Sequence, residues 1–400
     1  MNEENEQTFK IIIHKIFFNF SFFIHKIILI MLIFIYFFSL ECFVNNYRKK
    51  QRIFSLLKGN IFIKKNIEGI LINREIPTNF EPKISVIIPV YNCEKSIKSS
   101  IRSIQNQNFS NYEIILVNDF SNDTSLTIIE IMKNKDLRIK IINNHKNMGS
   151  LYSRNIGVLK AEGQYIIALD NDDLFFDEDI FFTLYNEAEK ESYEIIGFKA
   201  IDSPSYDANI SEYINNEFHE HRNNLVLYQP QLSIFPMSKK NKYYPNDFHI
   251  WGKIIKATLY KNAINILGEN RYSVFMSWHE DTIMVVVIFK LAKSFKFIGK
   301  YGIFHLLSNS TASFTQPTDN KMFGEIAFLD VMYDFTYNNK KCKKIVVEKA
   351  LELKDLNLYT IENKKNKIYL ISVIEKILKC KFIRDKDKKD LKIKYADILS

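Results

Sequence analysis

Glycine and proline are scarce in this chain, at 11 and 8 of its 400 residues. Their scarcity excludes collagen-like repeats and argues against long disordered or low-complexity tracts. The four cysteines lie far apart, and none belongs to a C-x-x-C pair; they are Cys42, Cys93, Cys342 and Cys380. This spacing predicts neither a zinc site nor a disulfide framework, and it leaves the redox compartment open.

Positive charge is not spread evenly along the chain. The net charge is +9, and much of the excess lies directly after an apolar N-terminal segment and in the C-terminal tail. A nucleic-acid surface would interleave aromatic side chains with such bases, and the tail does not show that pattern. We therefore expect no nucleic-acid partner. We expect residues 316–400 to form a helical basic region with a solvated face.

The most apolar uncharged run lies near the N-terminus, at Ile27–Leu40, and it extends through Glu41 to Val44. It is shorter than the ~20 residues that cross a bilayer, but its extension brings it close to that length. The run predicts a transmembrane anchor at 27–44, between an N-terminal tail at 1–26 and a stalk at 45–82. A cleaved signal peptide is disfavoured because its leading segment would be very long. A buried helix is the other alternative, although a run that is apolar all round suits a globular surface poorly.

From Lys83 onward, apolar strand-like runs alternate with helical patterns. The runs lie at 84–88, 113–117, 138–142 and 165–169. Helical spacing follows the first three of them, at Ile97, Ile101 and Ile104, then Leu126, Ile129 and Met132, then Tyr152, Ile156 and Leu159. Gly163 stands where a C′ glycine would end the third helix. The alternation predicts an α/β fold with a parallel sheet that is covered on both faces.

Polar residues gather where these strands end, at 90–92, 118–119, 147–155 and 170–173. Because the carboxyl ends of parallel strands meet at one edge of the sheet, these residues border the crevice in which such folds bind ligands. Asp170 and Asp172 form a D-x-D pair of oxygen ligands, which suits Mg²⁺ or Mn²⁺ and through it a phosphate. Such acids also serve as turn and cap residues, but their convergence with the other loops favours a phosphate-bearing nucleotide site.

At these positions the chain resembles the family 2 glycosyltransferases, which use nucleotide sugars and have the GT-A fold. The matching segments are Ser85–Asn92, Val117–Asp123, Asn147–Gly157 and Gly163–Asp173, and their order and spacing match across roughly 83–200. The resemblance implies a Rossmann-like, mostly parallel sheet flanked by helices over 83–315. Residues 83–200 would form the nucleotide-sugar half and 201–315 the acceptor half. The membrane helix would precede this domain, and the helical tail would follow it.

The resemblance also implies roles for residues in the nucleotide-sugar half. Asp119 would bind the nucleobase, while the segment that contains Pro89, Tyr91 and Asn92 packs against the base. Asp170 and Asp172 would hold Mn²⁺ or Mg²⁺, and the metal would neutralise the departing diphosphate. Arg154 would contact the diphosphate, with a surface salt bridge as the alternative. The chain departs from the family at Phe120, where the family prefers glycine.

Downstream, the segment Trp278–Asp281 resembles the E-D motif of this family, in which the aspartate deprotonates the acceptor hydroxyl. We therefore expect Asp281 to be the catalytic base and Glu280 to bind acceptor hydroxyls or to support the helix start. Acids in a first helical turn are also favoured by the helix dipole alone. His305 is a candidate third metal ligand, and a packed histidine is the alternative. The segment 251–253 resembles a Trp-Asn-Lys element of the family, with Gly252 in place of Asn.

These features together imply a membrane-anchored, metal-dependent, inverting glycosyltransferase. Its donor would be a nucleoside-diphosphate sugar, with UDP-sugar favoured, and its acceptor a glycan, a protein or a lipid. A sugar-nucleotide pyrophosphorylase is an alternative, but it would need a glycine-rich, basic loop that 90–96 lacks. A non-catalytic nucleotide-binding protein of the same fold is the other alternative, and the retained acids argue against it.

The side of the membrane on which the catalytic domain lies is the remaining expectation. More basic residues follow the apolar run than precede it, which favours a cytosolic domain. The N-x-T acceptor at Asn122–Thr124 points the same way, because a glycan there would crowd the nucleobase loop. Many eukaryotic enzymes with one anchor are lumenal instead. We therefore expect a single-pass protein of the endomembrane system, with both orientations open.

Overall fold

The computed structural model describes residues 80–203, 225–228, 249–273, 275–276, 279–307, 319–336, 346–347, 350–351, 364–379 and 383–395, the strand at 225–228 through its backbone. All of them belong to one compact unit, Gly59–Ser400. The predicted tail at 1–26, the anchor at 27–44 and nearly all of the stalk lie outside these residues, as does Trp278. Within the described ranges, no helix combines the length and the apolar character that a membrane span requires.

A nine-stranded sheet forms the centre of the described residues, in the order β3-β2-β1-β4-β8-β6-β9-β5, with β7 paired to β9. Four strands match the predicted runs and lie parallel, namely β1 (Ile84–Val90), β2 (Tyr112–Asn118), β3 (Ile139–Asn143) and β4 (Tyr165–Ala168). The expected parallel sheet is therefore confirmed for this half. The other half adds antiparallel pairs through β5 (Leu174–Phe175), β7 (Leu225–Tyr228) and β8 (Lys253–Lys256).

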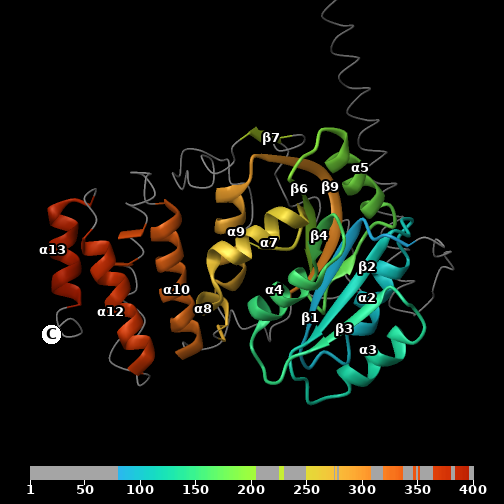
Figure 1. The fold of residues 1–400 in the computed structure, drawn as a ribbon, viewed down its shortest axis with the longest axis horizontal. Coiled ribbons are helices and arrows are strands. Elements are labelled where there is room, and N and C mark those ends of the chain that lie inside the picture. Colours follow the sequence, from blue (N-terminus) through green and yellow to red (C-terminus); the bar gives the residue numbers. More distant parts are fainter. Residues whose placement is uncertain are drawn as a thin grey trace, which may run out of the picture. The chain divides into compact units, whose positions relative to one another are not determined.

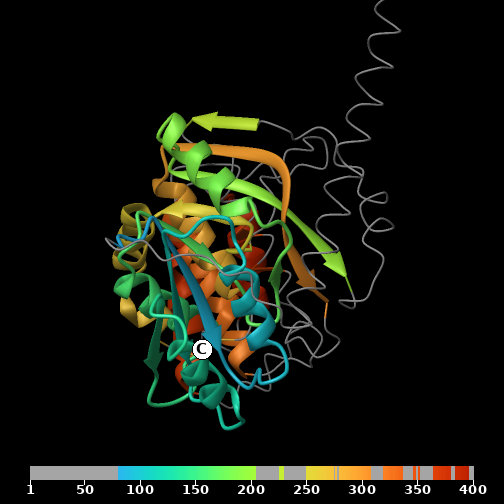
Figure 2. The ribbon, with the colours of Figure 1, turned by 90° about the vertical axis from the view of Figure 1, so that its right-hand side faces the viewer.

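Two long parallel strands complete the sheet, β6 (Ile195–Ser203) and β9 (Ser294–Leu306). Their register shifts between Gly197 and Ala200, which is the signature of a bulge. A bulge bends a strand and increases its twist. Figure 2 shows β9 turning sharply as it runs beside β6. The bend carries His305, near the end of β9, to the side of Asp202.

Strands β1, β2 and β4 are buried on both faces, which explains why they are largely apolar runs, whereas β3 at the end of the sheet is only partly buried. Alternate residues of β1 enter two different core clusters, Ile88 on one face and Ile87 on the other. Helices α2 (Ile97–Gln105), α3 (Ser125–Lys133) and α5 (Ile180–Lys190) cover the first face. Helices α4 (Ser150–Lys160), α7 (Ala257–Leu267) and α9 (Glu280–Leu291) cover the second. Figure 1 shows α2 and α3 on one side of the sheet and α4 and α7 on the other.

The predicted apolar face of α4 is wrong. Leu159 is exposed, and Tyr152 and Ile156 are only partly buried. The buried residues of this helix include Arg154 and Asn155 instead. Arg154 is compensated by ion pairs with Asp170 and Asp281, whereas the buried amide of Asn155 has no hydrogen-bond partner among the described residues. Apolar spacing alone therefore selects the wrong side of this helix.

Gly163 lies between α4 and β4, two residues before the start of β4, and its role differs from the expected left-handed C′ position. The glycines with positive φ in the described residues are Gly149, Gly252 and Gly268. A Cβ on Gly163 would lie 2.5 Å from Ser85 Oγ and 2.7 Å from Ser85 N. Its own N–H donates to Ser85 Oγ at 2.9 Å. The glycine is therefore required by the close approach of this turn to the β1 backbone.

The C-terminal region contains α10 (Asp319–Thr336), α12 (Lys364–Leu378) and α13 (Asp385–Lys394), in agreement with the helical expectation for these described segments. Helix α8 (Glu269–Tyr272) links α7 to the residues before α9. Helix α10 packs against α9, α12 against α10, and α13 against α12. Apolar side chains of all three helices join the core cluster that covers the second face of the sheet.

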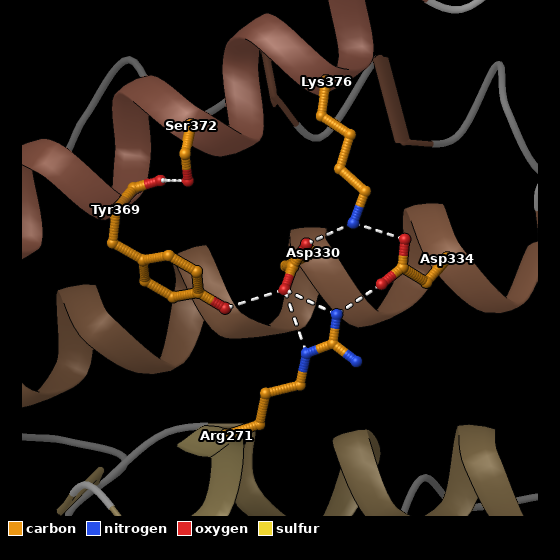
Figure 3. A network of polar contacts seen from close by, with 6 residues as sticks. All are labelled: Arg271, Asp330, Asp334, Tyr369, Ser372 and Lys376. Atoms are coloured by element: carbon orange, nitrogen blue, oxygen red, sulfur yellow. Dashed lines mark hydrogen bonds and ion pairs between the residues drawn. The ribbon is translucent and has the colours of Figure 1, made fainter. Parts of the chain in front are cut away.

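Lys376, one of the bases expected on a solvated face, is 34% exposed and takes part in ion pairs. Its ammonium group lies 2.7 Å from Asp330 Oδ1 and also pairs with Asp334. Arg271 of α8 pairs with the same two acids, and Tyr369 donates to Asp330 Oδ2 at 3.0 Å. Figure 3 shows these groups converging on Asp330, which is 6% exposed. Charge spacing in the sequence did not indicate this network, because its acids lie on another helix.

The two glycines that flank the end of α4 give a test of this packing. We expect Gly163→Ala to cost about 1–3 kcal/mol in the free energy of unfolding, because its Cβ would meet backbone that cannot move. Gly157→Ala is the matched comparison, since its Cβ would meet the Ile87 Cγ2 methyl at 2.6 Å. Methyl groups can shift, and alanine gains about 1 kcal/mol in a helix interior, so the cost should be smaller. Urea unfolding of both variants measures the difference; a larger loss for Gly157→Ala would contradict it.

Candidate active site

The acidic turn after β4 is fixed to the neighbouring elements. Leu169 N donates to Ile87 O at 3.1 Å, which continues the pairing with β1. Asn171 Nδ2 donates to Pro89 O at 3.0 Å, and Ser100 Oγ of α2 donates to Asn171 O at 2.9 Å. The turn closes through a 3.2 Å hydrogen bond from Asp173 N to Asp170 O. The D-x-D pair is therefore held at the carboxyl edge of the sheet, as the sequence predicted.

Negative charge accumulates in this turn. Burial and the neighbouring Asp170 raise the pKa of Asp172. Burial, Asp170 and Asp172 raise the pKa of Asp173 well above its usual range. Asp173 is fully buried; its Oδ1 accepts from Leu306 N at 3.1 Å, while its Oδ2 has no hydrogen-bond partner among the described residues. An orphaned carboxylate oxygen beside two further acids favours the approach of a cation.

Arg154 connects this turn to a distant part of the chain. Its Nη2 lies 2.7 Å from Asp170 Oδ1, and its Nη1 donates to Asp281 Oδ1. The side chain is 6% exposed, so the ion pairs are buried and are not the surface salt bridge that the sequence left open. Burial opposes the guanidinium charge, but Asp281 and Asp170 raise the pKa of Arg154 above its usual value. The donor contact predicted for Arg154 stays a prediction.

The predicted acid pair lies in the first turn of α9. Asp281 Oδ2 accepts from Ile250 N at 3.1 Å, so both of its oxygens have protein donors. Glu280 accepts from Ser150 Oγ, at the start of α4, at 2.7 Å. Burial and the charge of Asp281 raise the pKa of Glu280. The structure therefore brings Asp281, Arg154 and Asp170 into direct contact, although they come from different elements.

Asp119, the predicted nucleobase acid, is 3% exposed at the end of β2. Its Oδ1 accepts from Asn144 Nδ2 at 2.7 Å and from Met148 N at 2.9 Å, and its Oδ2 accepts from Gly149 N at 2.8 Å. A carboxylate has about four acceptor positions, so one remains for a ligand. Sequence reasoning missed this role in fixing the loop that starts α4. Two of the donors are backbone groups, which residue types do not reveal.

The loops after β1 and β2 are tied to each other. Asn92 Oδ1 accepts from Asn122 N at 2.9 Å, and Ser121 Oγ donates to Val90 O at 3.3 Å. Tyr91 is 43% exposed, and Phe120 is 58% exposed with a left-handed φ of 65°. A bulky residue rarely adopts that backbone conformation, in which glycine carries no penalty. The glycine preference of the family at this position thus has a physical reason.

His305 lies beside Asp202, with its Nδ1 2.8 Å from Asp202 Oδ1. Burial lowers the pKa of His305, but Asp202 and Asp173 raise this pKa, and the net result is a value of about 9. The ring stacks on Trp251 at 4.8 Å, and Trp251 stacks on His249 at 4.6 Å. A carboxylate on one ring nitrogen leaves the other nitrogen for a metal, but only in the neutral form. Among the described residues, no three or more His, Cys, Asp or Glu side chains form a group that could hold a metal ion without further ligands.

The segment Trp251–Lys253 precedes and begins β8. Gly252 has a left-handed φ of 69°, and its carbonyl accepts from Phe198 N at 2.9 Å. Lys253 is 4% exposed and donates to His249 O at 2.7 Å. Glycine carries no penalty in this left-handed conformation, which asparagine also adopts more readily than most residues.

Comparison with known proteins places these features in context. Residues 85–250 match the family described as glycosyl transferase family 2. An uncharacterized glycosyltransferase of Haemophilus influenzae is 46% identical over 92 residues, which cover 23% of this chain and 37% of that protein. Glycosyltransferase GlyG of Streptococcus pneumoniae is 29% identical over 134 residues, or 34% of this chain and 44% of that protein. The chain thus spans less than half the length of these relatives.

A solved structure extends the likeness beyond the matched segment. TarS 1-349 of S. aureus in complex with UDP-GlcNAc superposes on this chain with a TM-score of 0.54. The superposition covers 79% of this chain and 89% of TarS 1-349, at 16% sequence identity. Because the identity is low, the likeness concerns the fold alone. It confirms the predicted α/β architecture with helices on the sheet.

Asp173 gives a test of the charge in the acidic turn. Its pKa is raised in the folded state, so its contribution to stability is present below its ordinary pKa of about 4 and is lost as the pH rises through the raised value. We therefore expect Asp173→Asn to be more stable than the wild type near neutral pH in the presence of chelator, and this gain to vanish towards about pH 4.

Urea unfolding at several pH values measures this difference. Asp179→Asn is the control, because Asp179 accepts from Asn108 Nδ2 outside the acidic turn. A difference between Asp173→Asn and the wild type that did not change with pH would show that Asp173 carries no unfavourable charge.

Proposed function

The chain belongs to the family 2 glycosyltransferases through its residues 85–250, and we propose on this premise that it is a metal-dependent, inverting glycosyltransferase. Its donor is a nucleoside-diphosphate sugar, and we favour a UDP-sugar. The observation that carries the proposal is the ion-paired line Asp170, Arg154 and Asp281, which joins the D-x-D turn to the E-D pair. Groups for the departing diphosphate and for proton abstraction therefore belong to one site.

The choice of a UDP-sugar is supported by the structural neighbour. TarS 1-349 was crystallised with UDP-GlcNAc and, separately, with UDP. In this chain Asp119, at the end of β2, has three protein donors and one acceptor position open, and the loops after β1 and β2 carry the exposed rings of Tyr91 and Phe120. An imide N–H of uracil can donate to such a carboxylate, while aromatic side chains and the backbone near Pro89 and Asn92 pack against the base.

The metal in this proposal is Mn²⁺ or Mg²⁺. Mg²⁺ is usually bound through one or two carboxylates together with substrate phosphates and water, so a site without three protein ligands fits metal binding along with the donor. The orphaned oxygen of Asp173 and the raised pKa of Asp172 are the observations that favour a cation at this turn. Asp170 and Asp172 would hold it, and His305 is a further candidate through its second ring nitrogen. When bound, the metal would neutralise charge that develops on the diphosphate.

Asp281 is the proposed base. An inverting transfer requires a group that removes the proton of the acceptor hydroxyl as that oxygen attacks the sugar. Each oxygen of Asp281 has one protein donor, so acceptor positions remain on the carboxylate. Glu280 is held by Ser150 and lies next in the same turn, where it can bind further acceptor hydroxyls. We propose a glycan, protein or lipid acceptor.

Membrane attachment through residues 27–44 remains part of the proposal, as does a location in the endomembrane system. It is supported by the uncharged run at Ile27–Leu40.

To identify the donor, purified full-length protein should be incubated with UDP-sugars and GDP-sugars in Mn²⁺ and, in parallel, in chelator. We expect release of UDP from one of the UDP-sugars, which the chelator abolishes. Absence of release from every donor would contradict the proposal.

Asp172→Asn tests the metal role. Because the metal stabilises charge in the transition state by several kcal/mol, we expect donor hydrolysis or transfer to fall by about two to three orders of magnitude. The unfolding temperature should not fall, since a buried charge is removed. Asp179→Asn on the neighbouring segment should keep full activity. Wild-type turnover that is undiminished in chelator would refute the metal role.

Asp281→Asn tests the base. A general base acts in the transition state, so turnover should fall by about 10²–10⁴-fold while donor affinity changes little. Arg154 keeps Asp170 as a partner in this variant, so the fold should persist. Calorimetry with UDP measures affinity, and Glu280→Gln is the comparison with the smaller expected loss. If donor binding were lost while turnover per bound donor stayed normal, Asp281 would be a donor ligand.

A further inference from the structure

The helix that carries the proposed base begins at an unusual residue. His279, the N-cap of α9, has a left-handed φ of 59° without being glycine. Its carbonyl accepts the first hydrogen bond of the helix, from Ile283 N at 2.9 Å. Its side chain makes no capping hydrogen bond to α9. A residue held in this conformation requires support from its surroundings, and the support for His279 comes from another helix.

That helix is α10. The imidazole ring stacks on Phe328, with 4.4 Å between the ring centroids and 14° between the planes. Its Nε2 lies 3.2 Å from Glu325 Oε2. Glu325 and Phe328 are three residues apart, so they lie on one face of α10. The helix therefore contacts both the face and the edge of the ring.

Helix α10 is in turn fixed along its length. Asp330, just beyond Phe328, accepts from Arg271 of α8 and from Tyr369 and Lys376 of α12 (Figure 3). Buried ion pairs with several partners allow few alternative arrangements, because any shift would leave a charge without compensation. The network therefore keeps Glu325 and Phe328 at a constant position relative to α8 and α12.

We propose that α10 is a positioning element of the active site, in which Glu325 and Phe328 hold His279 and thereby set the direction in which α9 presents Asp281. The inference rests on the proposed role of Asp281 as the base. It gives the C-terminal helices a part in the reaction, although the segment that matches the family ends at residue 250. Misplacement of a catalytic group by about 1 Å can lower turnover by about 10²-fold. A small shift of α9 on loss of the contacts from α10 would therefore be enough to reduce turnover.

The variants separate positioning from general stability. Phe328→Leu removes the stacked ring, and Phe328→Tyr keeps it. Phe335→Leu is the matched control, because Phe335 lies on α10 two turns later and packs against the core. His279→Gly removes the ring that α10 contacts, while glycine still adopts the left-handed backbone conformation.

In full-length protein with UDP-sugar and acceptor, we expect Phe328→Leu and His279→Gly each to lower turnover about tenfold or more, with UDP affinity unchanged. Phe328→Tyr should keep turnover close to that of the wild type, because it retains the stacked ring. Phe335→Leu should lower the unfolding temperature without this loss of turnover. The double variant His279→Gly with Phe328→Leu should be no worse than either single variant, since both remove the same contact.

Hydrogen exchange gives a readout that does not depend on activity. The amide of Ile283 should exchange faster in Phe328→Leu than in Phe335→Leu, because only the first change loosens the helix start. Equal exchange in these two variants, or unchanged turnover in Phe328→Leu while the wild type is active, would overturn the positioning role. A wild type without transferase activity, or an active Asp281→Asn, would instead contradict the proposed function on which the inference rests.

Discussion

The buried guanidinium of Arg154 is the constraint on which the arrangement of the site depends. It comes from α4, its partner Asp170 follows β4, and its partner Asp281 begins α9. Leaving a buried charge without its partner costs about 3–5 kcal/mol, so none of these three elements can shift alone. The ion pairs thus couple the carboxyl edge of the sheet to a helix that begins more than a hundred residues later. Hydrogen bonds from Met148 and Gly149 to Asp119 extend the same coupling to the loop that starts α4.

Around Arg154 the acids outnumber the cation. Asp172, Asp173 and Glu280 all have raised pKa values, and burial is the first cause in each. A surplus of carboxyl groups that are buried or partly buried lowers stability near neutral pH, and groups with such shifted pKa values cluster at functional sites. In the proposed function, a divalent metal that arrives with the donor diphosphate would offset the surplus. In this proposal, the site is most stable when the metal and the donor are both bound.

The sequence predicted the first four strands closely, because β1, β2 and β4 are buried on both faces and are therefore largely apolar runs. It also placed Asp170 and Asp172 correctly, because polar residues at strand ends must converge. It failed for the buried side of α4, where Arg154 and Asn155 replace the expected apolar residues. The contact between Arg154 and Asp281 spans 127 positions, and no spacing rule covers such a pair. Likewise, the ring of His279, at the left-handed turn, stacks on Phe328 of α10, which no local pattern in the sequence indicates.

Helix α9 carries the proposed base and lies beyond the family-matched segment. Its residues Thr282–Phe289 are all buried, because α7 packs on one side and α10 on the other. Only its first turn carries acids, so the packing of the helix determines where Glu280 and Asp281 lie. A catalytic group on a helix that is packed on every side is held more precisely than one on a loop. Since α10 and α12 share the core cluster of α9, the C-terminal helices as well as the sheet contribute to the packing around the helix that carries Asp281.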